Sequence, residues 1–527
     1  MKHFVSSNPW WAMAGTCKYE RVLVSNTLNE DDLLMLDTIA EQIRVFDLVD
    51  LSAGELSGAN PGGEVPAGKF DLLVINGLDG DLITYESLGR FVDRYLDENA
   101  QVLLLESNRV YFTNALRNPR GFFSALIGGR GNLIRGAFGA ESLKRYETIS
   151  YTGEAYESFL PGHYYTNKNS FLGSERLKRI ILNSPISTFF YNSSLWVIQR
   201  GGRSADLVDD CRRELSRRPE IEWQGRQIKL VKTYYKHGKI ILSLTSRKDF
   251  APEHVLVIPM DRMTLRRREN EKRIVDELVS LELAAGVELP IISRGTLGKL
   301  TYFSMQEIPG ITVDVDNSHM ESMVQNAYRI LKKLTIFPRP ETPAFEEKKT
   351  VIVDAYLDGL LERYPPLKPD IERLFPIREL VAELPLVTFF HGDLKLENFL
   401  VDPVSYRING IIDFEQSEMP GPALLDLLFL INYNLQTVEQ NTFARAYARL
   451  VEGDAGANYQ PMIDDYCKTF RIDDLQRRLC LVVFLIHHYS RRIHINVRNR
   501  KSCAEFTDCI SRAESQLQRI SEIRSEF

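Results

Sequence analysis

Two short segments in the C-terminal half combine residue types that suit phosphate chemistry. Residues 391–398 read HGDLKLEN, and residues 411–415 read IIDFE. Apolar runs at 384–390 and 408–412 predict a strand leading into each segment. Transfer of a phosphoryl group needs a carboxylate that accepts or orients the attacking hydroxyl, and oxygen ligands for the Mg²⁺ that bridges the phosphates. Together the two segments supply all of these groups.

The two segments resemble the catalytic and metal-binding motifs of the aminoglycoside phosphotransferase and choline kinase family. The resemblance extends to the GPA sequence at 421–423 and to Asp426, for which we expect a structural role. It implies a bilobal, protein-kinase-like fold in the C-terminal part of the chain, and an activity that uses ATP and Mg²⁺.

The resemblance also implies a role for each polar residue of the two segments. Asp393 matches the catalytic base, and Asn398 and Asp413 match the metal ligands. His391 is expected to brace the catalytic loop rather than to react. Lys395 follows the base by two residues, where it can neutralise charge on the transferring phosphoryl group.

The residues before these segments predict the smaller lobe of a kinase. The pattern indicates three strands, one charged helix, and a further hairpin that leads to a hinge containing Met305 and Glu307. In chain order these elements are expected at 228–235, 239–244, 254–258, 264–284 and 299–307.

One position departs from the family pattern. Related enzymes carry a Lys or Arg in the third strand to hold the α- and β-phosphates, and Val257 stands there in this chain. A valine cannot pair with phosphate. The helix glutamate that holds this cation in relatives corresponds to Glu271. Lys239 in the preceding strand is a candidate replacement for the cation, as are Lys229 and Lys232.

The first ~200 residues alternate short apolar runs with helix-like stretches, which predicts a parallel sheet covered on both faces. A helix is expected at 85–97, and strands at 179–182 and 194–199 would close the sheet. The order resembles the class I S-adenosylmethionine-dependent methyltransferase fold. The apolar runs that predict the parallel strands lie at 22–24, 45–49, 70–75 and 101–105.

The glycine-rich turn that binds the cofactor in that family has no counterpart here. Residues 25–32 read SNTLNEDD, and such a loop would crowd and repel a cofactor that bears a carboxylate. Asp47 or Asp50 could still receive a ribose hydroxyl. S-adenosylmethionine binding is therefore left open, and a degenerate domain used for recognition or assembly is the favoured interpretation.

The predicted fold class is a multidomain α/β plus α+β protein. Residues 1–200 form a Rossmann-like, methyltransferase-type domain, and residues 201–226 form a linker with one helix at 205–216. Residues 227–310 form the kinase-like N-lobe, and residues 311–527 form the C-lobe with its catalytic loop and C-terminal helices.

Composition limits the partners and the compartment. The chain has 527 residues, a formal net charge of −6 and scattered basic residues, which indicates no nucleic-acid partner. Its six cysteines form no CxxC pair, so a reducing cytoplasm fits better than a disulfide framework or a zinc site. The longest apolar runs, at 424–431 and 479–486, are less than half of the ~20 residues that span a bilayer. They are expected to be core elements.

A helix at 475–496 carries two adjacent histidines, His487 and His488, and two adjacent arginines, Arg491 and Arg492. Adjacent residues point to different faces of a helix, so the pair is not expected to chelate one ion. The predicted arrangement is an amphipathic helix whose basic side borders the substrate cleft.

Three functional hypotheses follow from these patterns. The first is an ATP- and Mg²⁺-dependent kinase that phosphorylates a hydroxyl of a small molecule or glycan. The second is a pseudokinase joined to a pseudomethyltransferase, which the departures at Val257 and 25–32 favour. The third is a bifunctional enzyme that methylates and phosphorylates one substrate. The acceptor and the oligomeric state are not indicated by the sequence.

Overall fold

The structure is a computed structural model of the 527-residue chain. It divides into two compact units. The first comprises Met1–Thr166, Gly173–Arg268 and Ile291–Glu307, and the second comprises Asn167–Leu172, Glu269–Pro290 and Ile308–Phe527. The residues that the structure describes are 19–25, 40–46, 69–78, 85–107, 142–151, 155–159, 168–169, 193–199, 207–217, 229–236, 239–246, 253–283, 286–298, 300–313, 320–337, 343–439, 441–491 and 500–526.

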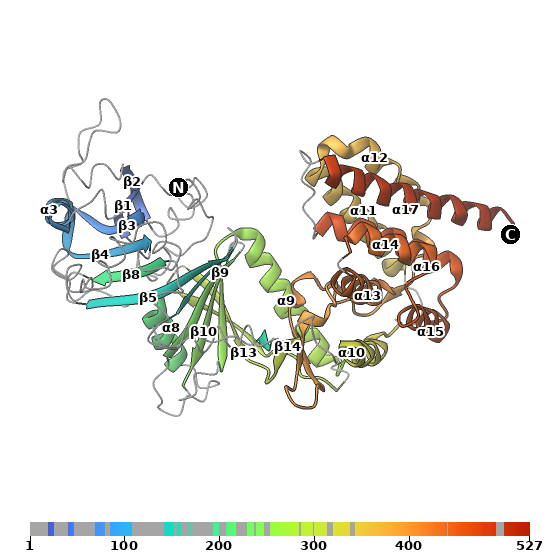
Figure 1. Ribbon diagram of the computed structural model, residues 1–527, viewed down its shortest axis with the longest axis horizontal. Helices are drawn as coiled ribbons and strands as arrows, with labels where there is room; N and C mark the ends of the chain where they lie inside the picture. Colours follow the sequence, from blue (N-terminus) through green and yellow to red (C-terminus); the bar gives the residue numbers. More distant parts are fainter. Residues whose placement is uncertain are drawn as a thin grey trace. The chain divides into compact units, whose positions relative to one another are not determined.

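The first unit is built on one twelve-stranded sheet with the order β12-β13-β11-β10-β9-β6-β5-β8-β4-β3-β1-β2 (Figure 1). Its strands are β1 (Tyr19–Ser25), β2 (Ala40–Phe46), β3 (Phe70–Leu78), β4 (Leu96–Ser107), β5 (Ser142–Tyr151), β6 (Ala155–Phe159), β8 (Ser193–Gln199), β9 (Lys229–Lys236), β10 (Lys239–Thr245), β11 (His254–Pro259), β12 (Ile292–Leu297) and β13 (Leu300–Gln306).

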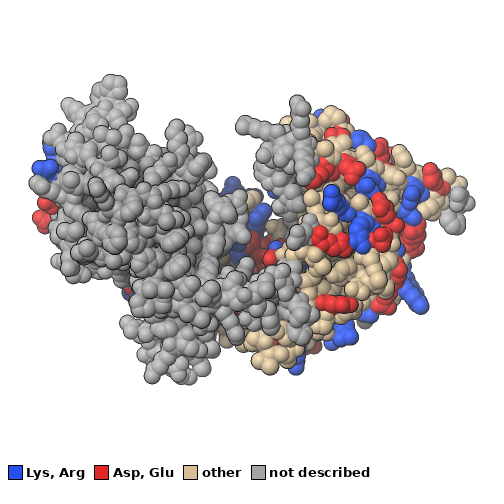
Figure 2. Space-filling model, viewed as in Figure 1, with Lys and Arg blue, Asp and Glu red and all other residues tan. Residues whose placement is uncertain are grey.

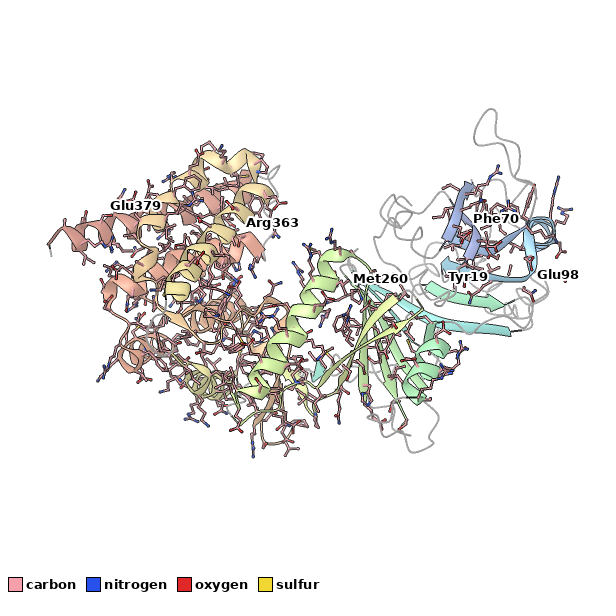
Figure 3. The ribbon with its side chains drawn as sticks, turned by 180° about the vertical axis from the view of Figure 1, so that it is seen from behind. Tyr19, Phe70, Glu98, Met260, Arg363 and Glu379 are labelled. Carbon is pink, nitrogen blue, oxygen red and sulfur yellow. The ribbon has the colours of Figure 1, made fainter. Side chains whose placement is uncertain are left out.

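The strands β2, β1, β3 and β4 pair in parallel, as the alternating pattern predicts. Val22, Leu23 and Val24 in β1 are all fully buried, which is typical of a central strand covered on both faces. Helix α3 (Tyr85–Tyr95) lies between β3 and β4 in the sequence, and β8 pairs antiparallel with β4. Figure 3 labels Tyr19 and Phe70 at the first residues of β1 and β3.

Several N-terminal predictions fall outside the described residues. They are the strand at 179–182, the loop at 26–32, and the acids Asp47 and Asp50. The second strand begins at Ala40, earlier than its apolar run indicates, and ends at Phe46. The likeness of this part to a methyltransferase therefore stays a prediction.

The other half of the sheet is antiparallel from β9 to β12. In β10 the side chains of Ile240, Leu242 and Leu244 are fully buried, and those of Lys239 and Ile241 are partly exposed, as alternation requires. Strand β9 also pairs with β6, so the strands predicted for the kinase N-lobe continue the N-terminal sheet. The predicted linker helix is α8 (Leu207–Ser216).

The second unit is mainly helical. Helix α9 (Arg262–Ser280) begins in the first unit and continues in the second. The other helices are α10 (Met320–Leu334), α11 (Pro343–Arg363), α12 (Lys368–Glu372), α13 (Leu425–Val438), α14 (Phe443–Glu452), α15 (Gln460–Phe470), α16 (Asp474–Arg491) and α17 (Arg500–Glu526). Figure 3 labels Arg363 at the end of α11 and Glu379 in the 3-10 turn η4 (Phe375–Glu379).

Two small sheets accompany these helices. One has the order β17-β16-β14-β7, and the other pairs β15 with β18. Their strands are β7 (Lys168–Asn169), β14 (Ile311–Val313), β15 (Leu386–Val387), β16 (Phe399–Val401), β17 (Ile408–Ile411) and β18 (Gly421–Pro422). Further 3-10 turns are η3 (Pro365–Leu367), η5 (Val381–Glu383), η6 (Leu396–Asn398) and η7 (Phe414–Gln416).

Both long apolar runs are core helices, as the sequence predicts. They lie in α13 and α16, and Leu427, Leu430, Val482 and Phe484 are essentially inaccessible to solvent. Within the described residues, no helix has the length and apolarity needed to cross a membrane. On the face shown in Figure 2, acidic and basic side chains of the second unit are interspersed.

The structure places the paired histidines in the interior of the second unit. His487 and His488 are both buried, and the ring of His488 stacks on that of Phe443 with centroids 3.6 Å apart. His487 contacts Phe390 and Tyr356 edge-on, with ring centroids 5.3 and 4.8 Å away. Burial lowers the pKa of both imidazoles, so the pair belongs to an aromatic core rather than to a basic surface.

Candidate active site

The two polar segments meet because β16 and β17 form an antiparallel pair. Phe399 at the start of β16 lies opposite Ile411 at the end of β17. The N–H of Ile412 donates to the carbonyl of Asn398 across 2.9 Å, which places the end of HGDLKLEN beside the start of DFE. The local hairpin therefore sets the spacing between Asn398 and Asp413.

His391 ties the same two segments together from within the core. Its ring is fully buried, and its Nδ1 accepts the N–H of Asp393 across 3.2 Å. That bond leaves the proton on Nε2, which donates to the carbonyl of Ile412 across 3.2 Å. One neutral imidazole thus fixes the backbone next to both Asp393 and Asp413.

Asp426, at the start of α13, anchors the backbone that precedes Asp393. Its carboxylate accepts the N–H groups of His391 and Gly392 across 2.8 and 3.0 Å. Burial raises the pKa of Asp426 to about 7, although the two donated bonds act in the opposite direction. Gly392 has φ +76°, and a Cβ there would lie 2.4 Å from the carbonyl oxygen of Gln416, so the close approach requires glycine.

The Asp393 side chain is 16% exposed. Asn398 Nδ2 donates to the Asp393 carbonyl across 2.8 Å, which leaves the amide oxygen of Asn398 as the atom that can bind a metal ion. Lys395 Nζ lies 3.9 Å from Asp393 Oδ2 and 3.3 Å from Glu397 Oε2. It also lies 5.6 Å from the ring centroid of Tyr433.

Asp413 occupies a left-handed backbone conformation, with φ 69° and ψ 56°. Aspartate tolerates this region better than most residues. The turn η7 follows at once, and the N–H of Phe414 donates to Oε1 of Glu271 across 3.2 Å. Glu271 comes from α9 and is 1% exposed.

The donor set suits Mg²⁺ bound together with nucleotide phosphates. Mg²⁺ usually takes one or two protein oxygens and completes its shell with phosphate oxygens and water. The Asn398 amide oxygen and the Asp413 carboxylate provide two such atoms on adjacent segments. Among the described residues, no group of three or more His, Cys, Asp or Glu side chains could hold a metal ion.

The remaining predicted site residues belong to the first unit. Lys239 lies opposite Pro259, and Ile241 lies opposite Val257, so Lys239 and Val257 share one face of the sheet. Val257 is 1% exposed. Met305 lies near the end of β13, and the N–H of Glu307 donates to the carbonyl of Glu253 across 3.0 Å.

A half-buried cluster around Glu418 was not found from the sequence. Tyr356 donates its hydroxyl to Glu418 Oε2 across 2.8 Å, and Arg491 Nη2 lies 2.8 Å from Oε1. The backbones of Glu418 and Phe390 exchange both of their hydrogen bonds, directly before His391. Burial raises the pKa of Glu418, and Arg491 opposes the rise. No motif marks Glu418, because its partners are distant in the chain.

Comparisons with known proteins are consistent with this geometry. Residues 248–462 match the family model described as APH, phosphotransferase enzyme family. No curated protein matches the chain. The range contains both polar segments and α9, which confirms the kinase-like fold predicted for the C-terminal part within a chain of mixed α/β content.

Solved structures similar to this chain include aminoglycoside phosphotransferases. A thermostable mutant of APH(4)-Ia in its apo form is 13% identical, with 57% of this chain and 97% of that chain covered and a TM-score of 0.35. APH(3'')-Id from Streptomyces rimosus is 16% identical, with 47% and 89% covered and a TM-score of 0.33.

Proposed function

We propose that the chain is an ATP- and Mg²⁺-dependent phosphotransferase that phosphorylates a hydroxyl group of a small molecule or glycan. The observation that carries the proposal is the β16–β17 pairing, which brings Asn398 beside the segment that contains Asp413. The hydrogen bond from the Asn398 side chain to the Asp393 carbonyl holds Asp393 beside the same two segments. The family match supports the reaction class.

Each residue has a defined task in this proposal. Asp393 accepts the proton of the acceptor hydroxyl as its oxygen attacks the γ-phosphorus, and the bond to the bridging oxygen of ADP breaks. Lys395, held near Asp393, stabilises charge on the transferring group. Asn398 and Asp413 hold Mg²⁺, which neutralises phosphate charge when it is bound.

A scaffold without catalysis is the second candidate, and one observation favours it. Val257 is buried opposite Ile241 and Phe303, so an apolar cluster occupies the position where relatives carry a cation. Lys239 lies on the same face of the sheet as Val257, and we propose that it supplies the missing cation. The proposal assigns no catalysis to the N-terminal part, and S-adenosylmethionine binding there would favour the bifunctional alternative instead.

Calorimetric titration of Mg·ATP into the full chain tests the proposal. We expect binding to the wild type and no measurable binding to Asp413→Ala, because that variant lacks a carboxylate that the nucleotide-bound metal needs. Asp358→Ala is the matched control, since the Asp358 side chain is 72% exposed on α11 and should leave binding unchanged. If the folded wild type does not bind Mg·ATP, the scaffold without catalysis becomes the favoured function.

A further inference from the structure

Helix α9 holds both ends of the turn that follows Asp413. At its start, the N–H of Phe414 donates to Glu271 Oε1 across 3.2 Å. At its end, Asn270 Nδ2 donates to the carbonyl of Ser417 across 2.9 Å. Two consecutive residues of one helix therefore clamp the whole of η7, in a part of the chain remote in sequence from α9.

The orientation of Asn270 in this clamp is fixed by a second bond. Arg273 Nη2 donates to Asn270 Oδ1 across 2.9 Å. The amide oxygen is thus occupied by a cationic donor, and the amide nitrogen faces the Ser417 carbonyl. The two clamp residues act in opposite senses, because Glu271 accepts from the turn and Asn270 donates to it.

We propose that Asn270 and Glu271 position Asp413 for metal binding, an inference that rests on the proposed phosphotransferase function. A single residue between two fixed peptide planes has little freedom in φ or ψ. His391 Nε2 holds the carbonyl of Ile412, and Glu271 holds the N–H of Phe414, so both planes beside Asp413 are anchored. The direction of the Asp413 carboxylate follows from this left-handed geometry.

This role differs from the one that the family resemblance implies for Glu271. A partner for a phosphate-binding cation must carry negative charge, whereas a partner for a backbone N–H needs only an acceptor oxygen. Glutamine keeps such an oxygen and has no charge. The substitution Glu271→Gln therefore separates the two roles, although a neutral acceptor makes a weaker bond than a carboxylate.

The experiment compares the full-length wild type with Glu271→Ala, Glu271→Gln and the control Asp276→Ala. Asp276 lies on the same helix, is 58% exposed and pairs with Lys272, which takes no part in the clamp. We expect Glu271→Ala to weaken Mn²⁺ binding, measured by electron paramagnetic resonance with a non-hydrolysable ATP analogue, by about tenfold, the size of one lost charge-assisted hydrogen bond. Glu271→Gln should recover most of this affinity, and Asp276→Ala should match the wild type.

Hydrogen exchange of the Phe414 amide, measured without nucleotide or metal, is the independent readout. We expect faster exchange in Glu271→Ala and nearly wild-type exchange in Glu271→Gln. Unchanged exchange in Glu271→Ala overturns the clamp, whether or not nucleotide binds. If Glu271→Gln binds Mn²⁺ as weakly as Glu271→Ala does, Glu271 acts through its charge, and the clamp is also overturned. A wild type that exchanges as expected but binds no Mn²⁺ nucleotide complex overturns the positioning role together with the proposed function.

Discussion

Asp393 and Asp413 follow two different strands, and the two side chains depend on different neighbours. Asp393 gives its carbonyl to Asn398 and its N–H to His391, so its backbone is held independently of its carboxylate. A substitution that changes only the carboxylate should leave the surrounding loop in place. Proton transfer and metal binding can therefore be separated by substitution at the two positions.

The variant Asp393→Asn should lose turnover while keeping Mg·ATP affinity. An amide cannot accept the hydroxyl proton, and general-base catalysis contributes about 10²–10⁴-fold to rate. The measurement is kcat with an accepted hydroxyl substrate, together with calorimetric affinity, and Asp358→Asn serves as the surface control. Unchanged kcat in Asp393→Asn would remove Asp393 from the proposed mechanism.

Asp426 makes the stability of the second unit depend on pH. Its pKa rises from 3.8 to about 7 on folding, so the native state holds more protons than the unfolded state between those values. The free energy of unfolding should therefore fall as pH rises through this window, and the contribution should be fully present only below it. Hydrogen exchange of α13 amides against pH should show this slope in the wild type and a smaller slope in Asp426→Asn. Equal slopes would contradict the assignment.

The sequence predicts site residues whose partners are close in the chain. It does not predict those whose partners are far away in the chain. Asp393 and Asn398 lie five positions apart in one segment, and the metal aspartate follows the next strand. Asn270 and Glu271 meet their partners across separations of 147 and 143 residues, so no spacing could predict their bonds to the turn. Only Glu271 was found, through the family resemblance, and for a different role.

At the scale of elements, the short strand β18 depends on a close approach. A Cβ on Gly421 would lie 2.2 Å from the Cβ of Phe390, which precedes the catalytic loop. Gly421→Ala should destabilise the second unit by about 1–3 kcal/mol, the usual cost of overpacking. Gly359 in α11 has only an ordinary contact, 3.4 Å from Ser490 Cβ, and Gly359→Ala should gain up to about 1 kcal/mol in helix propensity.

Hydrogen exchange of amides in α11 and α13 under denaturant measures both glycine variants in the same unit. The contrast between the two variants is the test, because a general effect of adding a methyl group would shift them in the same direction. Equal stability of Gly421→Ala and Gly359→Ala would contradict the packing at β18.

The shared face of β10 and β11 gives a prediction for nucleotide affinity. Lys239 lies on the same face as Val257, the position at which the family resemblance implies a phosphate-binding cation. Lys239→Ala should weaken Mg·ATP binding by about tenfold, as expected for one charge-assisted contact. Lys272→Ala, whose side chain pairs with Asp276 on α9, is the matched control for calorimetry. Equal Mg·ATP affinities in the two variants would mean that a residue other than Lys239 supplies the cation.

Local patterns predict individual elements better than their assembly. The alternation of buried and partly exposed residues in β10 and the run of buried residues in β1 each identify a strand. The pairing of β6 with β9 joins the predicted N-terminal and N-lobe strands into one sheet. Both strands carry polar residues, and neither sequence indicates which strand it pairs with. The joining of the two sets of strands into one sheet therefore could not be predicted.

At the scale of the whole molecule, nucleotide should protect the proposed site and leave the parallel strands of the first unit unaffected. A ligand that binds only the native state stabilises it by about 2.7 kcal/mol at a concentration of 100 times Kd. Hydrogen exchange of the full chain with a Mg²⁺ complex of a non-hydrolysable ATP analogue should show protection in residues 391–398 and 411–415. The parallel strands β1 and β4 should be unaffected, since the proposal gives them no phosphate contact.

The same exchange experiment with S-adenosylmethionine tests the N-terminal part. We expect no protection of β1 or β4, because the sequence at 25–32 contains no glycine and three acids, a composition that disfavours a carboxylate-bearing cofactor. Protection of β1 by S-adenosylmethionine would establish cofactor binding despite that loop and favour the bifunctional enzyme. The nucleotide response serves as the internal control, because it shows in the same sample that ligand binding is detectable.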